Sequence, residues 1–80
     1  MSEVYSLSGI SIEEAEKIAT EFVEKKRTDA KEITVNEVTD LDKGMRVSGT
    51  YTVPDLGPAG VFDWEVKIDK TKKVYGYKIP

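Results

Sequence analysis

The sequence predicts an α+β fold, in which a single helix packs across a curved, four-stranded antiparallel meander. Three observations predict it: one amphipathic helical segment near the start of the chain, four later segments with strand-like alternation, and short turn sequences between most of those segments. Consecutive strands joined by short turns pair as neighbours in an antiparallel sheet. The apolar face of the helix is therefore expected to cover one face of that sheet.

The helix is expected from Ser11 to Arg27. Ser11 and Glu14 form a capping box, in which each side chain satisfies a free backbone N–H of the other residue. Acidic residues crowd the first turn and basic residues crowd the last, which suits the helix dipole. One apolar stripe at helical spacing predicts the face that meets the sheet: Ile12, Ala15, Ile18, Ala19, Phe22 and Val23.

The first strand is expected at residues 32–40, but its alternation slips. Ile33 and Val35 share one face, whereas Val38 falls on the other. A β-bulge near residues 36–37 would restore the register and bend the strand around the helix, so we predict one there.

A tight hairpin at residues 42–44 is expected to lead into the second strand, residues 45–53. Gly44 is free to adopt a positive φ in that turn. One face of the strand carries most of the apolar residues, together with a glycine that leaves room for a close neighbour: Met45, Val47, Gly49, Tyr51 and Val53.

Residues 54–60 contain two prolines and two glycines and are expected to form a loop with defined bends. The third strand is expected at 61–69 and the last at 73–79, joined by a turn at 70–72. In the third strand the buried face is Phe62, Trp64, Val66 and Ile68, and in the last strand Val74 is expected on one face and Tyr75, Tyr77 and Ile79 on the other. In a meander, the 41–44 and 69–72 hairpins should lie at the same end and the 54–60 loop at the opposite end.

The 80-residue chain contains no His and no Cys, which excludes most familiar catalytic and metal-binding arrangements. The serines have no imidazole to act as base. The carboxylate pairs Asp40/Asp42 and Asp63/Glu65 are explained by turn chemistry and by a solvated strand face. Residues 57–60 lack the Lys and the following helix of a phosphate-binding loop. We therefore expect no enzymatic activity, no cofactor and no metal site.

Charge is unevenly distributed along the chain, whose net charge is −3. Acidic residues dominate the first half, and an overall negative charge argues against general nucleic-acid binding. The second half carries a basic excess near Trp64 and two tyrosines, which leaves weak nucleic-acid binding by the C-terminal hairpin as an alternative. The lysines of that excess are Lys67, Lys70, Lys72, Lys73 and Lys78.

Residues 1–10 are expected to be an N-terminal tail or a short edge strand, and residues 11–80 to be a single domain. The sequence shows no signal peptide and no apolar run long enough for a membrane span. These observations, with the absence of Cys, indicate a cytoplasmic protein without a membrane partner. The lack of Gln, the single Asn and the Lys/Glu enrichment give the composition a thermophile-like character.

Two stretches resemble the cystatin superfamily. The helix start Ser11–Glu14, running on to Val23, resembles a cystatin helix, and Met45–Thr50 resembles the Gln-x-Val-x-Gly hairpin motif with Val47 and Gly49 at the matching places. The resemblance implies a helix wrapped by an antiparallel meander, and a wedge of hairpins that plugs papain-like cysteine proteases. The chain departs from the family pattern because Met45 replaces the motif glutamine, and because the second hairpin has no Pro-Trp.

The second half also resembles PepSY-type domains. Residues 64–69 and 73–77 are similar to their ending of a strand, an Asp turn and a further strand. That resemblance implies the same architecture and an association with protease regulation, usually outside the cytoplasm.

Together these observations favour a small, non-enzymatic protein-binding domain, with a protease-inhibitor-like role as one form of that function. The partner is expected to be another protein. A small-molecule carrier that binds in the groove between helix and sheet is an alternative, and the sequence leaves open whether the protein is a monomer or a homodimer. The expected protein-binding residues are Gly44, Met45, Arg46, Val47, Lys70, Lys72 and Lys73.

Overall fold

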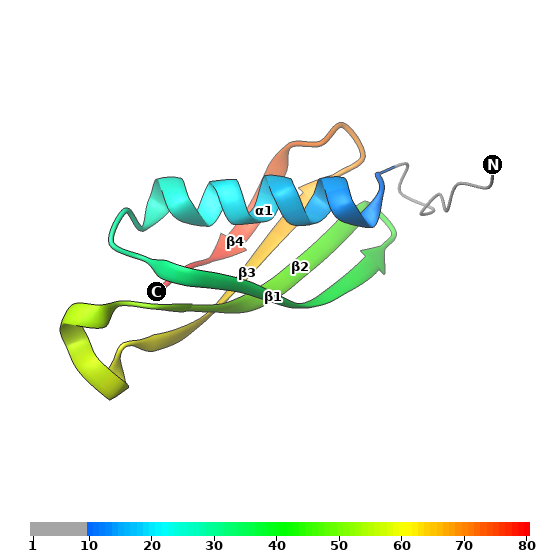
Figure 1. Ribbon diagram of the computed structural model, residues 1–80. Coiled ribbons are helices and arrows are strands. Elements are labelled where there is room, and N and C mark those ends of the chain that lie inside the picture. The colour runs from blue at the N-terminus through cyan, green and yellow to red at the C-terminus, as the bar shows by residue number, and fades with distance from the viewer. Residues whose placement is uncertain (1–9) are drawn as a thin grey trace.

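The computed structural model describes residues 10–80 and confirms the α+β fold, with one helix packed against a four-stranded antiparallel sheet (Figure 1). The expected tail or edge strand at residues 1–10 lies outside the described residues except for Ile10, which is buried. The strand order in the sheet is β1-β2-β3-β4, as expected for a meander. In chain order the elements are α1 (Ile12–Lys26), β1 (Lys31–Leu41), β2 (Gly44–Thr52), the 3₁₀ helix η1 (Pro54–Ala59), β3 (Val61–Asp69) and β4 (Val74–Lys78).

Helix α1 begins and ends close to the expected residues. The Ser11 hydroxyl oxygen accepts a hydrogen bond from the Glu14 backbone N–H at 3.1 Å, which is one half of the expected capping box. The Glu14 carboxylate, however, forms an ion pair with Lys72 Nζ at 2.8 Å. Ile12 was expected in the buried stripe but is 49% exposed, because the stripe turns toward the sheet only from Ala15 onward.

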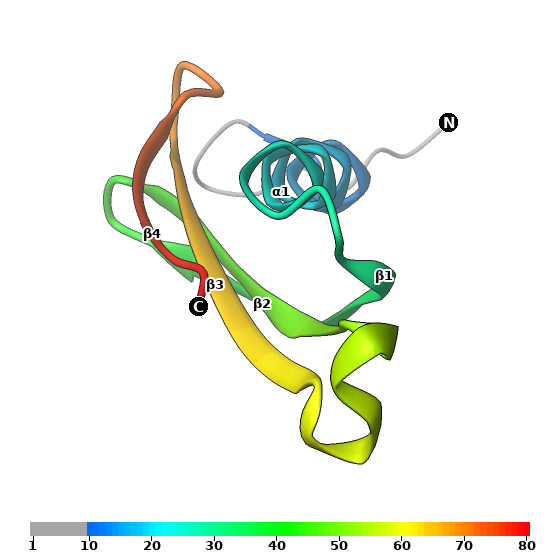
Figure 2. The same ribbon diagram turned by 90° about the vertical axis from the view of Figure 1, so that its left-hand side faces the viewer.

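The core lies between α1 and the sheet. Figure 2, a view close to the helix axis, shows that the sheet curves around the helix. Three small side chains of the helix allow the sheet to approach closely, and the larger side chains come from β2 and β3. Trp64 is 2% exposed and therefore belongs to this core, as expected. The fully buried or nearly buried apolar residues are Ile10, Ala15, Ala19, Val23, Met45, Val47, Tyr51, Val53, Trp64, Val66 and Ile68.

The predicted bulge in β1 is confirmed. Val35 pairs with Gly49 and Glu37 pairs with Ser48, so Asn36 is the extra residue. The bulge brings Val38 opposite Val47, on the same face as Val35. A second irregularity, between Lys31 and Thr34, was not expected from the alternation, and it contains Glu32 with a φ of 49°.

The expected faces of β4 are corrected by another bulge. Val74 pairs with Ile68 and Gly76 with Lys67, which makes Tyr75 the extra residue. Tyr77 then pairs with Val66. Val74 and Tyr77 therefore lie on the helix side of the sheet together, whereas simple alternation had placed them on opposite faces.

The two ends of the sheet are arranged as the meander requires. Gly44 pairs with Asp69, so the turns after β1 and β3 lie together, and Thr52 pairs with Val61 at the opposite end. That opposite end carries η1 in place of an irregular loop (Figure 1). Gly57 interrupts η1 with a φ of 62°, a left-handed conformation that glycine adopts without a steric penalty.

Candidate protein-binding surface

Two turns and the start of the helix meet at one end of the molecule. The pairing of Gly44 with Asp69 places the turn at residues 42–43 beside the turn at residues 70–73. The ion pair between Lys72 and Glu14 joins the second turn to the first turn of α1. We call this region the two-turn end; it comprises residues 42–46, 69–73 and the start of α1.

The second turn is fixed by the Asp69 side chain. Asp69 Oδ1 accepts hydrogen bonds from the Thr71 backbone N–H at 2.8 Å, the Thr71 hydroxyl at 2.6 Å and the Lys73 backbone N–H at 3.0 Å. These bonds, that from the Thr71 hydroxyl first, hold the pKa of Asp69 below its ordinary value. Lys72 has a φ of 70° within the turn. The carboxylate therefore organises a turn on which Lys70 and Lys73 are exposed and from which Lys72 reaches the Glu14 carboxylate.

Three of the expected site residues have no accessible side chain to offer a partner. Met45 is 2% exposed and Val47 is fully buried, because both point from β2 into the core. Gly44 is buried as well, and a Cβ there would lie 1.8 Å from the Ile68 carbonyl oxygen. Gly44 thus serves close strand packing, and Val47 and Gly49 of the cystatin-like motif lie inside a strand.

The other four expected residues reach the surface. Lys70, Lys72 and Lys73 are exposed in the second turn. Arg46 is partly exposed on the helix-free face of the sheet, where it pairs with Lys67 of β3 and Thr39 of β1. The structure therefore brings a cationic group of side chains together at and beside the two-turn end.

The aromatic side chains of β4 were not among the expected site residues. Tyr75 is 46% exposed and Tyr77 is 49% exposed. The Tyr77 ring meets the Phe22 ring edge-on at 4.9 Å, and Lys26 Nζ lies 5.1 Å from the Tyr77 ring centroid and 5.4 Å from that of Phe22. Phe22 and Lys26 are four residues apart and therefore lie together on one face of the helix. Their contact with Tyr77 could not be predicted, because the bulge in β4 that places Tyr77 on the helix side leaves no signal in the sequence.

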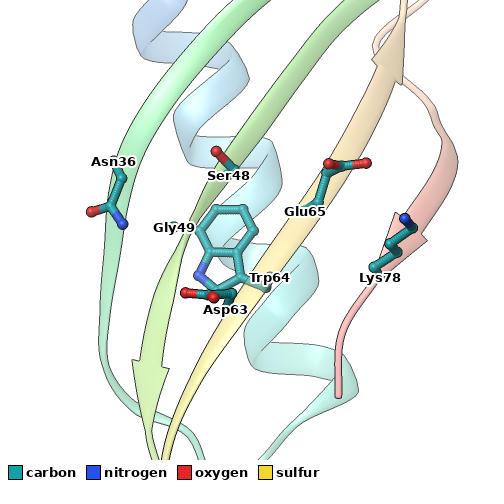
Figure 3. A pocket seen from close by; sticks show the side chains of 7 residues that line it. All are labelled: Asn36, Ser48, Gly49, Asp63, Trp64, Glu65 and Lys78. Carbon is teal, nitrogen blue, oxygen red and sulfur yellow. The ribbon is translucent and has the colours of Figure 1, made fainter.

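An open hollow lies on the helix-free face of the sheet, with α1 behind the strands in Figure 3. The bulge in β1 contributes Asn36 to it, and Glu65 and Lys78 are paired neighbours on β3 and β4. Its lining combines both signs of charge with neutral polar groups and the edge of the core: Asn36, Ser48, Gly49, Asp63, Trp64, Glu65 and Lys78.

Among residues 10–80, no three His, Cys, Asp or Glu side chains come together as a group that could hold a metal ion. Nor does the described chain contain a helix long and apolar enough to cross a membrane. Comparison of the chain with protein-family models, curated proteins and solved structures gave no match. The resemblances to cystatins and to PepSY-type domains therefore stay predictions.

Proposed function

We propose that the protein is a non-enzymatic protein-binding domain that contacts its partner through the two-turn end. The observation that carries the proposal is the Asp69 turn. This turn joins β3 to β4, and three hydrogen bonds to one Asp69 carboxylate oxygen fix its conformation. Lys70, Lys72 and Lys73 are exposed on it. A turn whose backbone is already fixed loses little backbone conformational entropy on binding.

A protease-inhibitor-like role is one form of this function. Two adjacent turns at one end of a helix-and-meander fold have the arrangement that a wedge requires. In this chain the wedge would act through the turn backbones, Arg46 and the lysines, because Met45 and Val47 are buried.

The test is an NMR amide-shift titration of the labelled protein with a papain-like cysteine protease. Perturbation confined to residues 41–46 and 69–73 would support the inhibitor-like form. An unperturbed spectrum at high protease concentration would leave only the broader protein-binding function.

Charge reversal tests that broader function. Reversal of Lys70, Lys72 and Lys73 to Glu should leave folding intact and weaken partner binding. Unchanged binding by the reversed variant would show that the two-turn end is the wrong surface.

The small-molecule carrier is not favoured. Met45, Tyr51 and Trp64 fill the space between helix and sheet, and each is at most 2% exposed. A hollow does lie between α1 and the start of β1, but its lining is mostly polar, which suits an apolar ligand poorly: Thr20, Glu24, Ala30, Lys31, Glu32 and Ile33.

A further inference from the structure

The outer edge of β4 has the properties of a strand-addition site. β4 stands at one end of the strand order, and within residues 10–80 no strand pairs with its far side. Backbone N–H and C=O groups on such an edge are available to an added strand. From this edge and its surroundings we infer that β4 receives an extended, acidic peptide segment of a partner protein, which pairs with it as a fifth strand.

The apolar side chains beside β4 supply one half of the recognition. α1 packs against β1, β2 and β3, and β4 lies at the margin of this packing. Tyr77 consequently remains half-exposed on the helix side, in contact with Phe22. A residue of an added strand directly opposite Tyr77 would pack against this aromatic pair, as cross-strand neighbours do in sheets.

Positive charge supplies the other half. Lys73 precedes β4 and Lys78 is its last residue; both are exposed, and Lys26 lies over the Tyr77 ring. Of the acidic groups nearby, Asp69 is bonded within its turn, and Glu65 lies opposite Lys78 in the β3–β4 pair with no ion pair between them. An acidic strand would therefore meet complementary charge at both ends of β4, from Lys73 and Lys78, and from Lys26 beside Tyr77.

The alternation of β4 makes the inference specific. Tyr77 faces the helix side of the sheet, while Lys78 lies opposite Glu65 on the helix-free face. Successive residues of a paired strand point to opposite faces. The partner segment should thus alternate apolar residues, which meet Tyr77 and Phe22, with acidic residues, which meet Lys78 and its neighbours.

The opposite edge of the sheet lacks these properties. β1 carries two register irregularities where β4 carries one, and, unlike β4, it exposes the acidic residues Glu32, Glu37 and Asp40. Lys78 at the end of β4 and Lys73 just before it likewise oppose antiparallel pairing with a second β4 of the same chain, because their like charges would come close together. An acidic segment from a different protein is consequently the occupant that the β4 edge accepts best.

The inference rests on the proposed protein-binding function and adds to it the mode of binding and the chemistry of the partner. It is tested by selecting binders from a phage-displayed library of random twelve-residue peptides. The enriched sequences are expected to alternate acidic and apolar residues. A synthetic copy should perturb the amides of residues 74–78 and give intermolecular NOEs between its backbone and β4.

Two changes test the pairing itself. N-methylation of alternate peptide nitrogens should weaken binding at least tenfold, because it removes backbone donors. The double reversal K73E/K78E should also weaken binding at least tenfold, whereas the matched reversal K17E/K31E, which makes the same charge change at exposed lysines on α1 and β1, should leave affinity unchanged. Circular dichroism and thermal unfolding of both variants would verify that they fold.

Several outcomes would overturn the inference. In the selection, these are an absence of enriched peptides or enrichment of basic sequences. In the binding measurements, they are binding that survives N-methylation or tighter binding of single-stranded oligothymidylate than of any peptide. Self-association of the protein that protects β4 from hydrogen exchange would also overturn it. Peptides that perturb only residues 69–73 would overturn strand addition while still supporting the two-turn end as a protein-binding surface.

Discussion

Trp64 lies across the β2–β3 pair from Gly49, and a Cβ added to Gly49 would come within 2.9 Å of the indole Cζ2 atom. The same Cβ would lie 1.8 Å from the Thr34 carbonyl oxygen. The indole N–H meanwhile donates a hydrogen bond to the Thr50 carbonyl at 3.1 Å. The missing side chain at Gly49 therefore allows β1 to approach and the largest core side chain to lie flat across β2.

Gly49→Ala should destabilise the protein by about 1 to 3 kcal/mol, since backbone and indole must both move to admit the methyl group. Urea unfolding followed by Trp64 fluorescence measures the change. Gly76→Ala is the matched control, because its nearest neighbour would be Lys67 Cδ at 3.7 Å, and it should shift stability by less than about 0.5 kcal/mol. Equal effects at the two glycines would contradict the argument.

The Tyr51 hydroxyl joins β2 to the last described residue. It donates a hydrogen bond to the Pro80 carbonyl, which also accepts one from Arg27 Nη1 at 2.7 Å. Tyr51→Phe should lower the free energy of unfolding by about 0.5 to 1.5 kcal/mol, the usual net contribution of one hydrogen bond, as measured by thermal unfolding. Tyr75→Phe, at a 46% exposed position, should be neutral within about 0.5 kcal/mol in the same thermal unfolding measurement. A neutral Tyr51→Phe would show that the Arg27 bond alone suffices.

The Asp69 turn should respond to acid. Because the folded-state pKa of Asp69 is lowered, its stabilising contribution is present above the unfolded-state pKa of about 3.9 and is lost as pH falls through the folded-state value. The Thr71 and Lys73 amide shifts should therefore titrate with a midpoint below the ordinary Asp range. Asp69→Asn should abolish that titration, and a midpoint at the ordinary value would contradict the hydrogen-bonding account.

The sequence was sufficient for the helix, the strand order and the bulge at Asn36, because those depend on local periodicity and on one visible break in alternation. It was insufficient at β4, because the bulge at Tyr75 produces no visible break in the alternation of apolar and polar residues. For the candidate surface, turn composition located the exposed lysines. The strand assignment already placed Met45 and Val47 on the buried face, where the structure has them. The cystatin-like motif instead implied that they bind a partner. The contact of Tyr77 with Phe22 depends on how far α1 extends over the sheet, and no local pattern encodes that.

Lys72 differs from the other turn lysines because it joins the turn to α1 through Glu14, at 2.8 Å between the charged atoms. Both side chains are partly exposed, so solvent screening limits the pair to about 0.2 to 1 kcal/mol. Lys72→Glu should lower the free energy of unfolding by that amount, because it removes the ion pair and brings two carboxylates together. Adding Glu14→Lys to this variant should restore an ion pair of reversed charge and recover that stability. A double-mutant cycle in thermal unfolding at low salt measures the coupling.

Lys70→Glu is the matched control for that cycle, because the described part of the chain shows no ion pair at Lys70. Lys70→Glu should leave the free energy of unfolding unchanged, both in the natural protein and in the Glu14→Lys variant. If Lys70 coupled to Glu14 as strongly as Lys72 does, long-range charge rather than the specific pair would connect the turn to the helix. If neither lysine coupled, the turn would be held by the Asp69 hydrogen bonds alone, and partner-binding losses in Lys72 variants could then be assigned to the binding surface itself.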